Sequence, residues 1–287
     1  MPEPEIADIQ AWSEKVRDDP VAYLQRQATE IILDAMAHTD GLRERVFLKG
    51  GTLMGLLYGS PRQTGDLDFS TNIKAADLPG TFFRAELEPQ FLTSAIRLGM
   101  PDILVNVQSV THKPRKDGFA EKRFPAFEIK FGYALRGAPE ERRFQERQAT
   151  TVIAADISFN EPIGATQPVR LGMDGSIIMV YSLLDLVAEK FRAYLQQIHR
   201  QRARRQDIYD LHYLLRTYDV DKTALLALIR KKCMARDISP NRDSLMEPGL
   251  MQSAQKEWDT MKLEIGDLPD FETCFQPVNA FYRSLPW

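Results

Sequence analysis

Apolar positions in the first part of the chain change from helical to strand-like spacing. Residues 6–16 and 21–37 repeat apolar side chains every three or four positions, which predicts two packed helices, and a further helix is expected over 82–98. Short apolar or alternating runs predict strands at 45–48, 67–70, 103–110, 127–133 and 151–159. The charge-rich segments 111–123 and 136–147 are typical of loops or hairpin ends, and the Pro- and Gly-bearing segment 161–176 of a linker.

The rest of the chain has helical spacing without comparable strand runs. Helices are expected over 183–198, 207–218, 222–232, 253–263 and 271–285. The pattern therefore predicts an α+β protein, with a mixed sheet and flanking helices in residues 1–175 and an all-helical domain in residues 176–287.

Composition and charge limit the classes of function. The 287 residues carry 37 Lys+Arg and 40 Asp+Glu, a net charge of −3, which excludes a wholly basic polymer binder. No apolar run approaches about 18 residues and the acidic start does not match an export signal, so we expect a cytoplasmic protein with no membrane contact. The two cysteines, Cys233 and Cys274, are expected to be reduced thiols.

A glycine pair follows the first predicted strand. Gly50, Gly51 and Thr52 stand between that strand and an apolar helical run, in a place where a backbone can approach a phosphate closely. The pair alone is more typical of a plain tight turn.

Two aspartates flank Leu67 about fifteen residues later. Alternate residues of a strand point to one face, so Asp66 and Asp68 should project side by side. Adjacent carboxylates repel each other unless a cation lies between them, and Mg²⁺ is commonly held by one or two carboxylates plus substrate phosphates. The alternative is a pair of solvated turn residues.

A two-metal displacement generally needs a third carboxylate. Asp156 shares a strand face with Ala154 and Ser158, opposite bulkier apolar residues, and Glu128 has a similar setting on its own strand. We favour Asp156, and Glu128 stays open. For either residue the alternative is an exposed carboxylate on a strand face.

A second polar group lies in the helical half. Arg204, Asp207 and Asp210 are spaced by three residues and share one helix face, so they could form part of a site or only a surface ion pair. The densest basic stretch in the chain lies nearby and could receive a polyphosphate or an RNA backbone, or could be a solvated helix end. Its members are Arg192, Arg200, Arg202, Arg204 and Arg205.

Together, these motifs resemble the AbiEii-type toxin branch of the nucleotidyltransferase superfamily that includes DNA polymerase beta. The likeness is carried by G-G-T at residues 50–52, R-x-T-x-D-L-D at 62–68, A-E-K at 188–190 and R-x-x-D-x-Y-D-L at 204–211. It implies a polymerase-beta-like mixed sheet followed by a helical domain. It also implies transfer of a nucleotide from an NTP, with Mg²⁺, to an acceptor hydroxyl.

The resemblance assigns roles to individual residues. The turn at Gly50, Gly51 and Thr52 would bind the triphosphate, with Arg62 and Thr64 near the phosphates or substrate. Asp66 and Asp68 would bind the metal. Lys190 would contact the nucleotide phosphates, and Asp207 and Asp210 would complete the active site.

Members of the family are implied to be the toxic half of a type IV toxin–antitoxin system active in phage defence, and some modify the tRNA 3′ end. We therefore expect an NTP substrate, a tRNA acceptor bound by the basic stretch, and an antitoxin partner. One competing hypothesis changes the acceptor to a small molecule such as an aminoglycoside, or to a protein side chain. Another is a nucleotide-binding regulatory module without catalysis.

Overall fold

The chain forms two compact units. The computed structural model describes residues 3–115, 118–200 and 204–287, without the side chains of 198–200. Unit 1 comprises Met1–Leu57, Thr64–Glu161 and Gln167–Val180, and unit 2 comprises Tyr58–Gln63, Pro162–Thr166 and Tyr181–Trp287.

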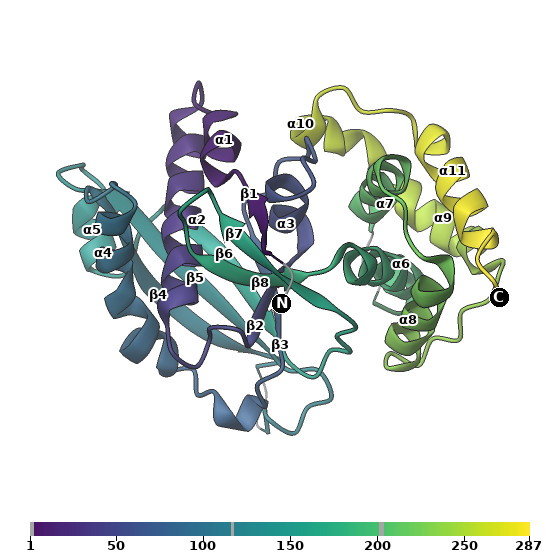
Figure 1. Cartoon of the computed structure of the whole chain (residues 1–287), viewed down its shortest axis with the longest axis horizontal. Coiled ribbons are helices and arrows are strands. Elements are labelled where there is room, and N and C mark those ends of the chain that lie inside the picture. Colours follow the sequence, from purple (N-terminus) through teal and green to yellow (C-terminus); the bar gives the residue numbers. More distant parts are fainter. Residues whose placement is uncertain (1–2, 116–117, 201–203) are drawn as a thin grey trace. The chain divides into compact units, whose positions relative to one another are not determined.

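Unit 1 is built on a mixed sheet of eight strands in the order β1-β7-β8-β2-β3-β6-β5-β4 (Figure 1). The pairs β1/β7, β2/β8 and β3/β6 are parallel, whereas β2/β3, β4/β5 and β5/β6 are antiparallel. The strands are β1 Glu5–Ala7, β2 Val46–Lys49, β3 Leu67–Thr71, β4 Ile103–Lys113, β5 Ala126–Leu135, β6 Val152–Ser158, β7 Thr166–Leu171 and β8 Ile177–Tyr181. The mixed sheet confirms the expected α+β class.

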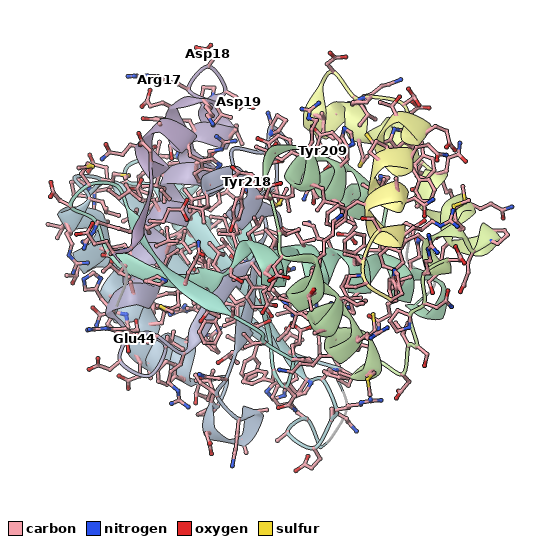
Figure 2. The ribbon with its side chains drawn as sticks, turned by 45° about the vertical axis from the view of Figure 1, so that its right-hand side comes forward. Arg17, Asp18, Asp19, Glu44, Tyr209 and Tyr218 are labelled. Carbon is pink, nitrogen blue, oxygen red and sulfur yellow. The ribbon has the colours of Figure 1, made fainter. Side chains whose placement is uncertain are left out.

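Helices flank this sheet. They are α1 Ile9–Glu14, α2 Pro20–His38, α3 Gly50–Leu56, α4 Glu88–Arg97 and α5 Glu141–Gln145, with short turns η1 Ala75–Asp77 and η2 Phe83–Leu87. The α2 helix packs against α4, and both contact β4 (Figure 1). It begins at Pro20 because the Asp19 side chain accepts hydrogen bonds from the Val21 and Ala22 N–H groups. Asp19 lies in the turn between α1 and α2 (Figure 2).

Aromatic side chains fill one face of β5 and β6. Phe127 meets Phe83 edge to face at 5.5 Å between ring centroids, and Phe159 in the same way at 5.4 Å. Because successive side chains alternate along a strand, the neighbours Glu128 and Asp156 lie on the opposite, less buried face. Packing of the core on one face therefore leaves only the side chains of the other face of β5 and β6 available for binding or catalysis.

The long C-terminal segment of unit 2 is helical, but the single helix expected over 253–263 is wrong, because this stretch is divided between two helices and a turn. The helices are α6 Leu183–Arg200, α7 Arg205–Thr217, α8 Lys222–Met234, α9 Pro248–Gln255, α10 Lys262–Ile265 and α11 Phe271–Arg283, with turns η3 Ser244–Met246 and η4 Trp258–Met261. The α6 helix packs on α7, α8 and α9, and α11 packs on α7. Among all the described residues, no helix combines the length and the apolar character needed to cross a bilayer.

Residues 58–63 join this unit through tyrosines of and after α7. The Tyr213 hydroxyl donates a hydrogen bond of 3.0 Å to the Tyr58 carbonyl. The Tyr58 ring packs edge to face on Tyr218, 5.4 Å away, and Figure 2 shows Tyr218 close to the end of α7. This anchoring holds Arg62 within unit 2.

Several local expectations are wrong. Residues 6 and 7 of the helix expected over 6–16 belong to β1, and the helix α1 begins only at Ile9. The segment 161–176 contains β7 rather than only a linker, and β8 follows it. Pairing of β7 with β1 begins at Val169, one residue after Pro168. The proline therefore lies outside the residues of β7 that pair with β1. Of the two charged segments expected to be loops or hairpin ends, 111–123 does lie at the end of the β4/β5 hairpin, whereas 136–147 contains the helix α5. In each case, sheet pairing or packing outweighs local composition.

The buried acid Glu30 on α2 should make the stability of unit 1 depend on pH. Burial, and then the neighbouring Asp34 charge, raise the Glu30 pKa from 4.5 to about 7. The folded state therefore holds this proton more tightly than the unfolded state, and stability falls as pH rises from 4.5 to about 7. We expect Glu30→Gln to stabilise the fold by about 1–3 kcal/mol at pH 8 and hardly at all near pH 4.5.

Hydrogen exchange of the α2 amides at the two pH values measures this effect. The matched control is Glu86→Gln, because Glu86 is exposed on η2. An equal gain for Glu30→Gln at both pH values would show that its charge is not the cause.

Candidate active site

The predicted glycine turn lies directly against the predicted metal-binding aspartate. The α3 helix begins at Gly50, immediately after β2 ends at Lys49, and Gly50 has a φ of 74°. A Cβ atom at this position would lie 2.3 Å from Asp68 Oδ2. Only glycine allows the backbone of residue 50 and the Asp68 carboxylate to lie so close.

A hydrogen bond also joins the two sequence motifs. The buried Thr52 hydroxyl donates to the Asp66 carbonyl at 2.7 Å. Asp66 is exposed just before β3, and Thr64 is half-buried two residues earlier. The start of α3 and the D-x-D segment therefore form one local structure in unit 1.

Asp68 belongs to a row of charged residues on four neighbouring strands. Pairing matches Lys49 on β2 with Asp68 on β3, Asp68 with Asp156 on β6, and Asp156 with Glu128 on β5. Directly paired residues share a sheet face, and neighbouring strands are about 4.8 Å apart. We call these four residues the charged row. Of the two candidates for a third carboxylate, Asp156 is the neighbour of Asp68, and Glu128 lies one strand further away.

Lys113, at the end of β4, bridges Asp156 and Glu128 of the charged row. Its Nζ atom lies 2.6 Å from Glu128 Oε2 and 3.1 Å from Asp156 Oδ1. Burial lowers the pKa of Lys113, but the two carboxylates raise it by more than burial lowers it. The Lys113 pKa therefore lies above its ordinary value. The hydrogen bond from Lys113 holds the Glu128 pKa below its ordinary value. The sequence pattern did not identify Lys113, because its role depends on strand register.

At the other end of the charged row, Lys49 forms a buried ion pair with Glu161. The two side chains are 10% and 7% exposed, and the Ser70 hydroxyl donates a 2.7 Å hydrogen bond to Glu161 Oε2. In the sequence, Glu161 is the first residue of the segment expected to be a linker. The signal that could have marked it is its position just after a buried strand. This pair holds Lys49, and with it the start of α3.

The oxygen donors of unit 1 fit a divalent cation that also binds substrate. Among the residues that the structure describes, no group of three or more His, Cys, Asp or Glu is arranged to hold a metal ion by itself. Mg²⁺ does not require one, because it is usually bound by one or two carboxylates, water and substrate phosphates. Asp68 provides one carboxylate beside the close backbone approach at Gly50, and Asp66, exposed two residues earlier, provides a second in the same segment.

In unit 2, four predicted residues form one buried cluster. Asp210 is fully buried and accepts two 3.0 Å hydrogen bonds from Arg62, while Lys190 Nζ lies 2.5 Å from Asp210 Oδ2. Lys190 also lies 3.7 Å from Asp207 Oδ1. Arg62 completes its contacts with Glu264 on α10, at 3.4 Å. Arg62, expected near substrate phosphates, is thus joined to residues of the second sequence block.

Charge pairing dominates the electrostatics of this cluster. Burial raises the pKa of Asp210, but Arg62 and Lys190 lower it by more, so it lies below its ordinary value. Burial lowers the pKa of Arg62, which Asp210 and then Glu264 raise above its ordinary value. Asp207 Oδ2 is buried without a hydrogen-bond partner among the described residues, so it can accept one from a ligand or water.

The basic stretch is smaller than the sequence suggests. Arg192 is buried and paired with Glu189 and Gln196, so it is not part of an exposed patch. Arg204 is half-buried before α7, and Arg205 lies 3.7 Å from Glu257. Arg202 and the side chain of Arg200 lie outside the described residues.

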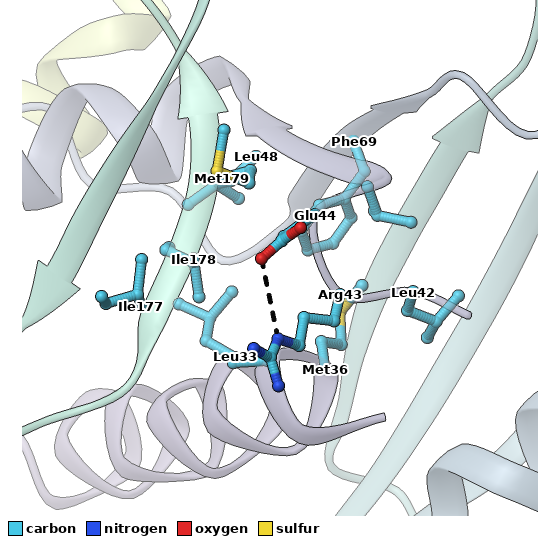
Figure 3. A pocket seen from close by; sticks show the side chains of 12 residues that line it. Leu33, Met36, Leu42, Arg43, Glu44, Leu48, Phe69, Ile177, Ile178 and Met179 are labelled. Carbon is cyan, nitrogen blue, oxygen red and sulfur yellow. Dashed lines mark ion pairs between the residues drawn. The ribbon is translucent and has the colours of Figure 1, made fainter. Parts of the chain in front are cut away.

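An apolar pocket of unit 1 lies on the face of the sheet opposite the charged row. Side chains of α2, β2, β3 and β8 line it, and the Arg43–Glu44 ion pair lies beside them at 3.9 Å (Figure 3). Phe69 lines this pocket and alternates with Asp68 along β3, so the pocket is on the sheet face opposite the charged row. It does not include any of the candidate residues.

Most of the chain matches the model of one protein family. Residues 31–277 match the model of a family described as "Nucleotidyl transferase AbiEii toxin, Type IV TA system". A search of curated proteins finds no relative.

Several solved structures are similar to the chain, two of them as follows. MenT4, a nucleotidyltransferase toxin from Mycobacterium tuberculosis, is 15% identical with a TM-score of 0.49; the match covers 96% of this chain and 99% of MenT4. JHP933 from Helicobacter pylori is 14% identical with a TM-score of 0.43, and the match covers 91% and 90%. The family assignment rests on the family match alone.

Proposed function

Because the chain belongs to the AbiEii family of nucleotidyl transferase toxins of type IV toxin–antitoxin systems, we propose that it transfers a nucleoside monophosphate from an NTP to the 3′ hydroxyl of a tRNA. The observation that supports this most directly is the contact of Gly50 with Asp68 at the charged row. At this place the backbone could approach the phosphates of a nucleotide closely, and neighbouring carboxylates could bind a cation.

In the proposed reaction the acceptor oxygen attacks the α-phosphorus. A new P–O bond forms, the bond from the α-phosphorus to the bridging oxygen breaks, pyrophosphate leaves, and the hydroxyl proton passes to solvent. Asp66 and Asp68 would hold Mg²⁺, which supplies positive charge for the phosphates and the attacking oxygen. Asp156 adds a third carboxylate next to Asp68. Gly50, Gly51 and Thr52 position the phosphates, with Thr64 nearby.

For unit 2 we propose that Lys190 contacts the nucleotide phosphates. Asp207 and Asp210 hold its Nζ atom, and Arg62 neutralises Asp210. Arg200, Arg202, Arg204 and Arg205 are the proposed tRNA contacts, with affinity that falls as salt rises. The remaining parts of the proposal are a protein antitoxin as partner, a cytoplasmic location and a role in phage defence.

Incubation of the full chain with each α-labelled NTP and Mg²⁺ tests the reaction. Parallel samples contain total tRNA, an aminoglycoside, a protein mixture or no acceptor. We expect the label to enter only tRNA, with one pyrophosphate released for each nucleotide added.

Each other outcome contradicts the proposal in a specific way. Label in the aminoglycoside or in protein would assign a different acceptor. NTP binding without transfer to any of them would favour a regulatory module. A signal that Asp68→Ala does not remove would show that the charged row is not the active site.

A further inference from the structure

A cation that belongs to the protein, the Lys113 ammonium, lies against two carboxylates of the charged row. Lys113 Nζ lies 2.6 Å from Glu128 Oε2, and 3.1 and 3.4 Å from the two oxygens of Asp156. These three carboxylate oxygens surround the place that an ion bridging the two acids would take. Lys113 is therefore positioned as a substitute for such an ion.

We propose that Lys113 takes the place of a second metal ion, so that Asp66 and Asp68 bind one divalent ion while Asp156 and Glu128 keep a lysine ammonium between them. This inference rests on the proposed function. It makes Lys113 a positioning residue that holds Asp156 beside Asp68 without a second ion.

Strand register explains how Lys113 reaches both acids. Thr111 pairs with Glu128 on β5, and Lys113 is two residues further along β4 on the same face. Diagonal neighbours at this offset are within reach of a long side chain. Glu128 in turn pairs with Asp156, so one lysine can contact both carboxylates.

Charge and space both oppose a metal ion at the same place. A divalent ion bound to these carboxylates would require oxygens about 2.1 Å away that now bind an ammonium group. It would also lie within a few ångströms of that like charge, at a distance where repulsion is strong near a protein surface. The Lys113 and Asp156 side chains are 44% and 43% exposed, so dissolved ions can reach the cluster and the competition can be measured.

Binding of Mn²⁺ to the full chain, without nucleotide, tests this inference by a readout independent of activity. Electron paramagnetic resonance counts free and bound Mn²⁺ during a titration. We expect Lys113→Met to bind one more ion than the unmutated chain, with at least tenfold higher affinity than any second ion on that chain. Lys113→Arg keeps the positive charge and should leave the stoichiometry unchanged.

Two further variants distinguish a local effect from a general change in charge. Lys130→Met removes an exposed lysine from the same face of β5, two residues from Glu128, and should not add an ion. The double variant Lys113→Met/Glu128→Gln should lose the added ion. Circular dichroism shows whether each variant is folded.

Equal Mn²⁺ stoichiometry for Lys113→Met and the unmutated chain would overturn the inference, because the lysine would then move aside or exclude nothing. An extra ion on Lys130→Met would overturn it as well. Failure of the proposed function gives a different pattern, in which Lys113→Met gains an ion although no acceptor is labelled.

Discussion

Replacing Asp68 with asparagine is expected to reduce nucleotidyl transfer about a thousandfold. The substitution keeps the size of the side chain beside Gly50 but removes the charge that would hold Mg²⁺ on the triphosphate. Metal ions supply several kcal/mol of charge stabilisation in such reactions, and each 1.4 kcal/mol corresponds to a factor of ten. The measurement is the initial rate of pyrophosphate release with tRNA and a saturating NTP.

The matched control is Asp77→Asn, which changes an exposed aspartate on η1 of the same unit. It should retain full activity. Circular dichroism should be the same for both variants, because the asparagine fits the same space on β3. If Asp68→Asn kept more than a tenth of the rate, Asp68 would not be a metal ligand in the reaction.

Asp210→Ala is expected to destabilise unit 2 by about 3–5 kcal/mol, because it leaves the buried charges of Arg62 and Lys190 without their main partner. Hydrogen exchange of α6 and α7 measures the effect locally. Exchange in β4 and β5 of unit 1 serves as the internal reference. Two units need not unfold in one step, so a single melting temperature would be less informative.

The matched control for this prediction is Asp259→Ala. Asp259 is an exposed aspartate on η4 of the same unit, paired with Lys262, and its loss should cost less than about 1 kcal/mol. The Asp210 pKa is lowered by folding, so the contribution of this carboxylate is fully present above the unfolded pKa of about 3.9 and is lost as pH falls through the lower folded value. The destabilisation should therefore be equal at pH 6 and pH 8. A cost near that of the control would show that the cluster is dispensable for folding.

The alternation of residues along each strand is sufficient to predict which acids lie on the less buried face of the sheet, the face of the charged row. Asp156 alternates with Ile157, and Asp68 with Phe69, so periodicity alone separates the buried side chains from the less buried ones. The helical half was predictable for a similar reason, since its apolar stripes are long. These features depend on residues close together in the sequence.

Contacts between strands that are far apart in the sequence could not be predicted from the spacing of residues along the chain. Lys113 lies 43 residues from Asp156, and Lys49 lies 112 residues from Glu161. Nothing local indicates that either lysine has an acidic partner. The strand β8 was missed because it follows a segment rich in proline and glycine, and pairing with β2 outweighs that composition.

The basic stretch shows the opposite limitation. No acid lies between Arg192 and the arginines that follow it in the sequence, but its partner Glu189 lies one helical turn earlier. Charge density along a sequence does not distinguish arginines facing solvent from arginines paired in the interior.

The contact between Gly50 and Asp68 also ties these two positions together in any set of related sequences. A larger residue at position 50 fits only if position 68 loses its carboxylate or β3 shifts, because the added Cβ would overlap Asp68 Oδ2. The two positions should therefore change together rather than independently. A relative with a side chain at position 50 is expected to lack the acid at position 68, and to have kept the fold while losing catalysis.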